Sequence, residues 1–457
     1  MTPYPAYKPT GLPWFPQIPE HWDIIRAKQI FAPIDIRSQS GEEQLLSVSE
    51  RHGVVKREDA NVTMFQAASY EGYKLCWPDD LAINSLWAWS FGLGFSPYHG
   101  IISTAYSVFR LKDKTKCLPR FYDYFVRGKD FHWELRVRSK GLWKSRYQLS
   151  DDAFLAAPMP SIPIDEQVQI VRYLDSMTAK INKLIRAKKK QIALLQEQKQ
   201  AIINQAVTKG LNPDAEMKDS GVWCIVKTPA HWQKIPVKGI AKFINGFAFA
   251  SDSFIINYTF PVVRIGDICD NGDINFNCHF GVEDDNKLDD FIIKEGDILI
   301  AMSGATTGKV GIARGVPNKS FINQRVGIIR SANCQYLYYC LSNHVFQEYV
   351  TMLSAGSAQP NLSGEDIKNY QIMYPTQSEI SEITTYLDKK CTAIDAAISK
   401  HRAVVSTLQE YKNSLISAAV TGQIDVRNIP VDDFDPADLV PETEDDQEED
   451  TINESEE

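Results

Sequence analysis

The sequence predicts an α+β protein built as a tandem repeat with pseudo-two-fold symmetry. Two globular α/β regions are separated by two long helices that pair as an antiparallel coiled coil. Residues 173–208 match residues 386–421 without gaps at an offset of 213, with 13 identities in 36 positions. Both segments carry an apolar heptad pattern. The regions between them show the short apolar runs and the Gly and Asn turns that are typical of β-strands.

Start and stop signals place the two helices in the chain. Pro163 and Pro375 precede the matching segments, and Gly210 and Gly422 follow them, as expected at helix ends. We therefore expect five parts: globular regions at 1–162 and 211–374, a central helix at 163–210, a distal helix at 375–427 and a disordered acidic tail at 428–457.

The heptad pattern predicts a narrow apolar seam on each helix. An ordinary amphipathic core helix is the alternative interpretation, but two copies with matching seams favour pairing with one another. The predicted seam residues are Leu174, Ile181, Ile185, Ile192, Leu195 and Ile202 in the first copy, and Leu387, Ile394, Ile398, Val405, Leu408 and Leu415 in the second.

The globular regions share a frame but diverge in their middles. Pro19-Glu20-His21-Trp22 matches Pro229-Ala230-His231-Trp232 at an offset of 210. Fainter matches link 80–83 with 297–300 and Arg110 with Arg330. Such His-Trp pairs more often pack than catalyse, so we interpret the shared frame as structural.

The net charge of −9 conceals two opposite regions. Residues 431–457 hold fourteen acidic and no basic residues, and the remaining chain has 49 basic and 44 acidic residues. A like-charge run of this kind predicts a solvated tail; we favour a solubilising role over a nucleic-acid mimic or a partner hook. Residues 110–146 hold twelve Lys or Arg against four acidic residues, which predicts a surface that attracts phosphate.

Several function classes find no support in the sequence. No run of 18 uncharged apolar residues predicts a membrane span, and the N-terminus does not resemble a secretory signal. The eight cysteines form no Cys-x-x-Cys pair, which favours reduced thiols in the cytoplasm over a metal site. Residues 304–310 resemble a phosphate loop, but the spacing is one residue short and Val310 replaces the Ser or Thr. We expect no catalytic centre, metal or cofactor.

The ordered set of motifs resembles the specificity subunit of type I restriction–modification systems over about residues 1–427. The second helix start, 375–379, departs from the family pattern because it lacks the Glu-Gln pair. The motifs that carry the resemblance are 19–22 and 229–232, the helix start 163–167 with 173–175, and 265–268, 296–306, 323–327 and 356–362.

This resemblance implies a subunit that performs no chemistry. Each globular region would be a target-recognition domain that reads one half of a split site in double-stranded DNA. The helices would fix the separation of the halves and dock two methyltransferase subunits, and motor-nuclease subunits would join that complex. S-adenosylmethionine, magnesium and ATP would belong to those partners, and no membrane is implied.

Candidate DNA contacts were chosen for their chemistry in predicted loops. Gln and Asn suit adenine edges, Arg suits guanine and Lys suits phosphate; the alternative for each residue is a structural role in a turn. The candidates are Arg51, Lys56, Arg57, Ser103, Lys140, Lys144 and Arg146 in the first region, and Ser303, Thr306, Thr307, Lys309, Gln324, Arg325, Ser357, Gln359 and Asn361 in the second.

Two other hypotheses stay open at this point. The chain could be a coiled-coil scaffold or adaptor without a nucleic-acid role, or a DNA-modifying enzyme whose catalytic residues are not recognised. The basic segment 110–146 argues against the first, and the missing catalytic motifs argue against the second.

Overall fold

The chain folds into two compact units. Unit 1 comprises Met1–Lys189 and Ala403–Glu457, and unit 2 comprises Lys190–Arg402. The structure, a computed structural model, describes residues 2–50, 52–60, 69–141, 147–222, 224–250, 253–256, 258–283, 286–317, 319–354 and 361–439.

Unit 1 is built on a four-stranded antiparallel sheet in the order β4-β11-β8-β9. Two small hairpin-like sheets, β5-β6 and β7-β10, pack beside it, and β1-β2 and β3-β12 complete the frame. The strands are β1 Tyr7–Leu12, β2 Phe15–Pro19, β3 Asp23–Arg26, β4 Phe31–Pro33, β5 Leu46–Ser49, β6 Gly53–Lys56, β7 Lys74–Cys76, β8 Asp80–Asn84, β9 Leu93–Phe95, β10 Gly100–Ile102, β11 Tyr106–Leu111 and β12 Pro158–Ser161. The short helices are α1 Ala27–Ile30, η1 Arg57–Asp59, η2 Ala88–Ser90, α2 Pro119–Val126, α3 Lys129–Arg138 and α4 Asp151–Leu155.

Unit 2 repeats this frame with the four-stranded order β16-β22-β19-β20. Its second sheet differs, because β17 pairs antiparallel with β18 and parallel with β21. The strands are β13 Met217–Val222, β14 Ile225–Pro229, β15 Gln233–Pro236, β16 Ala241–Asn245, β17 Phe260–Val263, β18 Gly281–Val282, β19 Ile298–Ala301, β20 Val310–Ile312, β21 Phe321–Ile322, β22 Val326–Ser331 and β23 Gln371–Tyr374. The short helices are η4 Val237–Gly239, η6 Ile265–Asp267, η7 Asn286–Phe291, α6 Cys334–Leu341, α7 His344–Ser354 and α8 Gly364–Asn369.

The same ion pair closes one end of each four-stranded sheet. Arg110 donates from Nε and Nη2 to the two carboxylate oxygens of Asp80, both at 2.7 Å. Arg330 binds Asp297 in the same bidentate way, at 2.7 and 2.6 Å. Both aspartates are almost fully buried. The faint sequence match between 80–83 and 297–300 therefore marks equivalent strands, β8 and β19.

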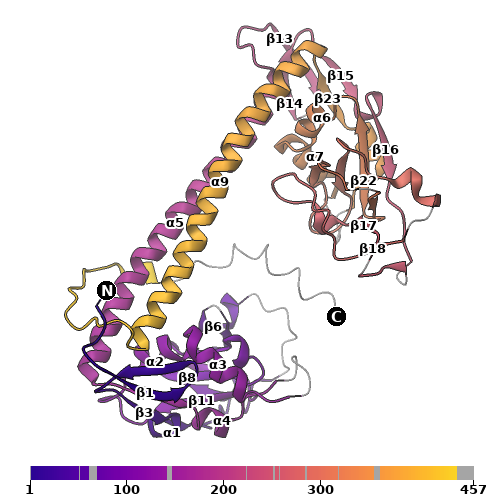
Figure 1. Cartoon of the computed structure of the whole chain (residues 1–457). Coiled ribbons are helices and arrows are strands. Elements are labelled where there is room, and N and C mark those ends of the chain that lie inside the picture. The colour runs from indigo at the N-terminus through magenta and orange to yellow at the C-terminus, as the bar shows by residue number, and fades with distance from the viewer. Residues whose placement is uncertain are drawn as a thin grey trace. The chain divides into compact units, whose positions relative to one another are not determined.

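Two long helices, α5 (Ile164–Lys209) and α9 (Gln377–Val420), contribute to both units. In each unit their segments lie side by side and run antiparallel (Figure 1). In unit 1 Lys412 of α9 donates to Asn182 of α5, and in unit 2 Lys199 of α5 pairs with Asp395 of α9. The predicted α+β class with paired long helices is confirmed.

Except for Leu415, the predicted seam residues are buried in the N-terminal half of each long helix and half-buried in the C-terminal half. Val405 and Leu408 still pack against the main core of unit 1. Leu174, Ile181, Ile185, Leu387, Ile394, Ile398 and Leu415 are buried; Ile192, Leu195, Ile202, Val405 and Leu408 are half-buried.

The repeated His-Trp motif connects the end of one long helix to the start of the other. In unit 1 His21 contacts Glu166 of α5 at 2.8 Å, and Trp22 packs against Gly422, which ends α9. In unit 2 His231 contacts Glu379 of α9 at 2.9 Å. There Trp232 packs against Gly210, which ends α5.

The two glycines of these connections have a left-handed backbone conformation that favours glycine. Both have positive φ, +75° at Gly210 and +69° at Gly422, as is common just past a helix end. A Cβ on Gly422 would lie only 2.4 Å from Cδ of Pro19.

The start of the second long helix keeps the acidic residue that its sequence appeared to lack. Glu379 lies 213 residues after Glu166, and only Gln167 is replaced, by Ile380.

The acidic tail was predicted to be disordered from residue 428, and this is wrong as far as Leu439. Gln169 of α5 donates to the main-chain carbonyls of Val426 and Ile429, at 3.0 and 2.8 Å. Side chains of α5 also bind residues 432 and 438. The segment is ordered because α5 supplies donors and cations that neutralise it locally. Residues 440–457 lie outside the described residues.

Candidate nucleic-acid interface

Three loops of unit 2 meet at the sheet end opposite the Asp297–Arg330 pair. Met302 follows β19; its N–H donates to the carbonyl of Arg325 at 2.9 Å, and its carbonyl accepts from Leu362 N–H at 2.8 Å. Ser303 forms a β-bridge with Asn361. Backbone hydrogen bonds thus bring together candidates that lie far apart in the sequence: Ser303, Arg325 and Asn361.

The side chains of this loop group present polar atoms of several kinds. Gln324, Arg325 and Asn361 are exposed. Among the described residues, the hydroxyl oxygens of Ser303 and Thr306 are enclosed without a hydrogen-bond partner, which is uncommon for buried polar atoms. Exposed amides and a guanidinium are the groups that read adenine and guanine edges. Ser357 and Gln359 lie outside the described residues.

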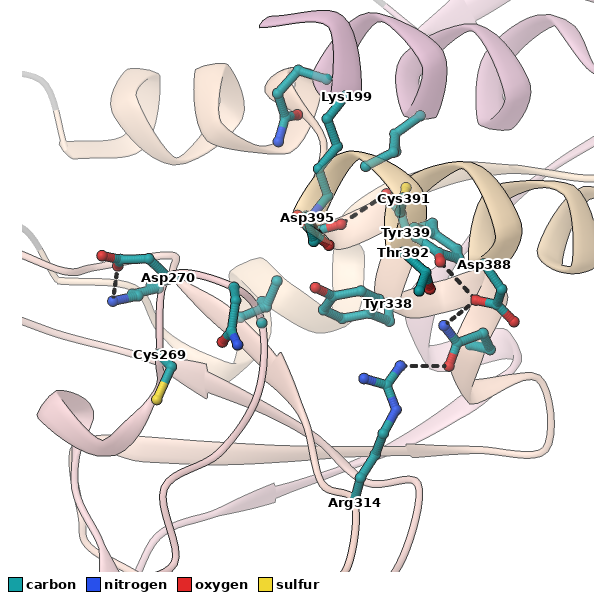
Figure 2. A pocket seen from close by; sticks show the side chains of 18 of the residues that line it. Lys199, Cys269, Asp270, Arg314, Tyr338, Tyr339, Asp388, Cys391, Thr392 and Asp395 are labelled. Carbon is teal, nitrogen blue, oxygen red and sulfur yellow. Dashed lines mark hydrogen bonds and ion pairs between the residues drawn. The ribbon is translucent and has the colours of Figure 1, made fainter. Parts of the chain in front are cut away.

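Two other candidates of this unit have structural partners. Thr307 donates its hydroxyl to the carbonyl of Gly304 at 2.7 Å, which closes a local turn. Lys309 pairs with Asp270 and lines a cavity of about 550 Å³ between loop 269–272, α6 and the long helices (Figure 2). The structure therefore separates the lysine of the loop that resembles a phosphate loop from the exposed group at the sheet end.

The cavity in Figure 2 does not have the chemistry of an anion site or a nucleophile. Its lining balances Lys199, Lys309 and Arg314 against Asp270, Asp388 and Asp395. Burial raises the pKa of the Cys391 thiol to about 11, so that thiol is protonated at neutral pH. Within the described part of the chain, no group of three or more His, Cys, Asp or Glu is placed to hold a metal ion.

In unit 1, three candidates gather around two tyrosines. Lys56 lies over the ring of Tyr98, 5.8 Å from its centroid. Arg57 lowers the pKa of Tyr106, although burial dominates and raises it overall. Tyr106 N–H in turn donates to the carbonyl of Ser103 at 3.0 Å. Tyr106 pairs with Asn84, the last residue of β8. Ser103 and Tyr106 therefore lie at the sheet end away from the Asp80–Arg110 pair, as in unit 2, whereas Tyr98 follows Ser96, which hydrogen-bonds to Asp80 at the other end.

The basic segment 110–146 is largely used for structural contacts. Lys140 is exposed and pairs with Gln148 through the backbone, whereas Arg51, Lys144 and Arg146 lie outside the described residues. The contacts that occupy its cations are Arg110–Asp80, Lys114–Asp79, Lys116–Asp113, Arg120–Asp175, Arg138–Glu134, Lys112 with the carbonyl of Lys28, and Arg127 with the carbonyl of Glu50. The local positive charge is therefore a weaker sign of phosphate binding than its composition indicated.

The sequence analysis missed one surface at the same end of unit 1. The connection between β8 and β9 is equivalent to the loop between β19 and β20, and it exposes Leu86 and Trp87. The ring of Trp87 stacks on that of Trp89, with 5.8 Å between centroids. Extending the match between 80–83 and 297–300 by a few residues would have identified this loop. No described helix has the length and apolar character needed to cross a bilayer.

Comparisons with known proteins agree with this arrangement. Residues 229–401 match the family described as type I restriction modification DNA specificity domain. The chain is 24% identical over 340 residues to the type I restriction enzyme MjaVIII specificity subunit of Methanocaldococcus jannaschii, covering 72% of this chain and 76% of that protein. It is 34% identical over 100 residues to the MjaIX specificity subunit of the same organism, covering 21% and 22%.

One solved chain has the same fold over nearly its whole length. The structure that contains this chain is described as the structural basis underlying complex assembly and conformational transition of the type I R-M system. The two chains are 15% identical, and the likeness covers 89% of this chain and 99% of the other, with a TM-score of 0.62. The resemblance inferred from the sequence motifs is confirmed.

Proposed function

Because residues 229–401 match the type I restriction modification DNA specificity domain and the chain is similar over 340 residues to a type I specificity subunit, we propose that it is a specificity subunit that recognises a split, asymmetric site in double-stranded DNA and performs no catalysis itself. Each unit reads one half of the site with the loops at the open end of its four-stranded sheet. Two modules add their discrimination, since each base pair contributes only about 1–3 kcal/mol and the second binding step is intramolecular.

A shared frame that carries different loops is the observation on which this proposal rests. The Asp–Arg pairs and sheet orders of the two units are equivalent. Their open ends are not, because the loop before β11 exposes Thr104 and Ala105, whereas the equivalent loop before β22 exposes Gln324 and Arg325. Two copies of one scaffold with unlike contact surfaces suit two unlike half-sites.

The long helices are the proposed docking platform for two methyltransferase subunits, through which motor-nuclease subunits join in the cytoplasm. Half-buried apolar residues in the C-terminal halves of the two helices, among them Ile192, Leu195 and Leu408, support docking there, because partly exposed apolar surface favours association. S-adenosylmethionine, magnesium and ATP would act in the partner subunits. This chain would supply position only.

Methylation mapping tests the proposal directly. The full chain is expressed with a type I methyltransferase partner, and methylated sites are read by single-molecule sequencing. We expect one motif made of two unlike half-sites with a fixed spacer. A host genome without any new methylation motif would contradict the proposal and favour a scaffold, and modification by the isolated chain would favour an enzyme.

Matched variants test whether Gln324 and Arg325 contact the bases of one half-site. Gln324→Ala and Arg325→Ala should relax or change one half-site and leave the other intact, with a loss of about 1–3 kcal/mol for a lost bidentate contact. Lys242→Ala is the control, because Lys242 is exposed on β16 and pairs in register with Arg330, at the opposite end of the sheet. An unchanged motif in both loop variants would show that unit 2 reads DNA with other residues.

A further inference from the structure

The acidic strap, defined here as Val431–Leu439, is held by four side chains of α5 in unit 1. Ser176 donates to the main-chain carbonyl of Asp432 at 3.1 Å, and Lys180 binds its carboxylate at 2.5 Å. Asn182 donates to the carbonyl of Asp438 at 3.0 Å, and Arg186 pairs with its carboxylate. We call each of these two pairs of contacts a grip. Each grip combines one side chain that donates to a peptide carbonyl with one cation that binds a carboxylate.

The spacing of the two grips requires a folded ligand. Lys180 and Arg186 are six residues apart on a helix, or about 9 Å. Six residues of extended chain would span about 20 Å. The strap shortens itself with a turn: Asp438 N–H donates to the carbonyl of Asp435, and Oδ1 of Asp435 accepts from Ala437 N–H, both at 2.9 Å. A plain polyanion does not have this shape.

The grips of α5 are not repeated at the equivalent positions of α9. The positions of α9 that lie 213 residues after Ser176, Lys180, Asn182 and Arg186 are Lys389, Ala393, Asp395 and Ser399. Ala393 cannot bind a carboxylate and an ionised Asp395 cannot donate to a peptide carbonyl, so α9 lacks one partner of each pair of contacts. One copy of the helix has therefore acquired a contact surface that the other copy lacks.

One of the two charged contacts of the strap is weak enough to exchange, whereas the other is more buried, with Arg186 and Asp438 31% and 21% exposed. The Lys180–Asp432 pair is largely exposed, at 46% and 77% of the two side chains, and such pairs contribute little to stability and are screened by salt. By contrast, Val426, which precedes the strap, is fully buried in the core of unit 1. Release can therefore be confined to the strap without unfolding the residues before it.

We propose that this face of α5 is a binding site for an acidic peptide with an Asp-Pro turn, with the strap as its resident ligand. A partner protein that carries such a segment displaces the strap and docks on Ser176, Lys180, Asn182 and Arg186. A peptide is favoured over nucleic acid because two of the four contacts are made to main-chain carbonyls. The site is independent of DNA reading.

Binding of a labelled peptide with the sequence of residues 430–439 tests the proposal on the full chain. A tethered ligand acts at an effective concentration in the mM range, so the wild-type chain should bind the free peptide weakly. The double variant Asp432→Asn with Asp438→Asn weakens the strap and leaves the site intact. It should bind the peptide at least tenfold more tightly, as measured by fluorescence anisotropy.

Further variants locate the site. Adding Lys180→Ala and Arg186→Ala to the strap variant should abolish the gain. Lys389→Ala with Lys390→Ala is the control on α9, where both lysines are exposed, and it should change nothing. Circular dichroism of each variant verifies that the long helices persist.

Four results would overturn the proposal. They are no gain in the strap variant, equal binding of a scrambled peptide of the same composition, displacement of the peptide by a DNA duplex as effectively as by unlabelled peptide, and hydrogen exchange of the strap as slow as that of the core. None depends on methylation, so the proposed DNA-recognition function and this site can fail separately.

Discussion

The two units hold the same lysine of the helix seam in different ways. In unit 2 Lys199 pairs with Asp395, with both carboxylate oxygens within 2.8 Å. Lys412, 213 residues later, has Asn182 as its partner in unit 1, at 3.1 Å. Burial lowers the pKa of Lys412, because no carboxylate offsets the loss of water at this position. One copy therefore has an ion pair where the other has a buried cation bound to an amide.

The strap explains why unit 1 uses an amide. Asn182 accepts from Lys412 through Oδ1 and donates to the carbonyl of Asp438 through Nδ2. An aspartate could accept from Lys412 but could not donate to the carbonyl of Asp438. Asp395 is 38% exposed, and an ionised carboxylate serves its single partner well. A repeat diverges where one copy must satisfy a neighbour that the other copy does not have.

The connection between the long helix and the globular part also differs in charge. Asp175 accepts from Tyr124 at 2.6 Å and from Arg120 at 3.1 Å in unit 1. Asp388 accepts from Tyr339 at 2.6 Å and from the neutral Gln335 at 2.8 Å in unit 2. A cation holds the carboxylate in one unit, whereas in the other the same position borders the polar cavity.

The largest effect is expected where the units are most alike. Asp80→Ala and Asp297→Ala each leave a partly buried guanidinium without its carboxylate. Breaking a buried pair costs about 3–5 kcal/mol. The arginines here are 36% and 28% exposed, so we expect about 2–3 kcal/mol in each unit. Urea unfolding combined with hydrogen exchange of each sheet measures the loss unit by unit.

Lys114→Ala is the control for this comparison, because Lys114 forms an exposed pair with Asp79, beside Asp80. It should cost well under about 1 kcal/mol. If only one of the two buried-pair variants loses stability, the common geometry of the sheets does not reflect common energetics.

A smaller effect is expected from exchanging the seam residues. Asp395→Asn makes unit 2 resemble unit 1 and should cost about 1–2 kcal/mol, because Lys199 is mostly buried and loses a charged hydrogen bond. Asn182→Asp supplies Lys412 with a carboxylate but places it against the carbonyl of Asp438. We expect a net change within about 0.5 kcal/mol and faster hydrogen exchange in the strap. Glu410→Gln, an exposed change on α9, is the control; equal effects of the two exchanges would mean that the strap does not determine the choice of Asn182.

The frame of the molecule could be predicted from the sequence because repetition makes it visible. The ungapped match of the helices and the paired His-Trp motifs come from residues that make the same contacts twice, such as Glu166 and Glu379. The order of the strap could not be predicted, because its acidic composition is typical of a solvated tail and the donors of α5 that bind it are not recognisable in the sequence. The role of Lys309 was hidden because its partner, Asp270, lies in another loop, outside the motif that contains Lys309.

A further expected effect concerns pH and the two His-Trp connections. Burial acts to raise the pKa of Glu379, but hydrogen bonds from His231, Trp232 and Thr376 outweigh it and lower the pKa to about 2. The unfolded chain binds that proton near pH 4.5. The contribution to stability is therefore present above pH 4.5 and is lost as the pH falls toward 2.

Glu379→Gln should therefore lower the free energy of unfolding at pH 6 and reduce its decline between pH 4.5 and 2. The expected loss is about 1 kcal/mol, because charged hydrogen bonds contribute about 1.5–3 kcal/mol and this carboxylate is 31% exposed. Glu166→Gln is the matched variant in unit 1, where Tyr4 donates to the carboxylate and the indole nitrogen of Trp22 has no partner within the part of the chain that the structure describes. Urea unfolding at several pH values measures both. If Glu379→Gln keeps the full acid-dependent decline, the indole and imidazole donors of unit 2 do not stabilise the charged carboxylate, and the two connections differ in geometry alone.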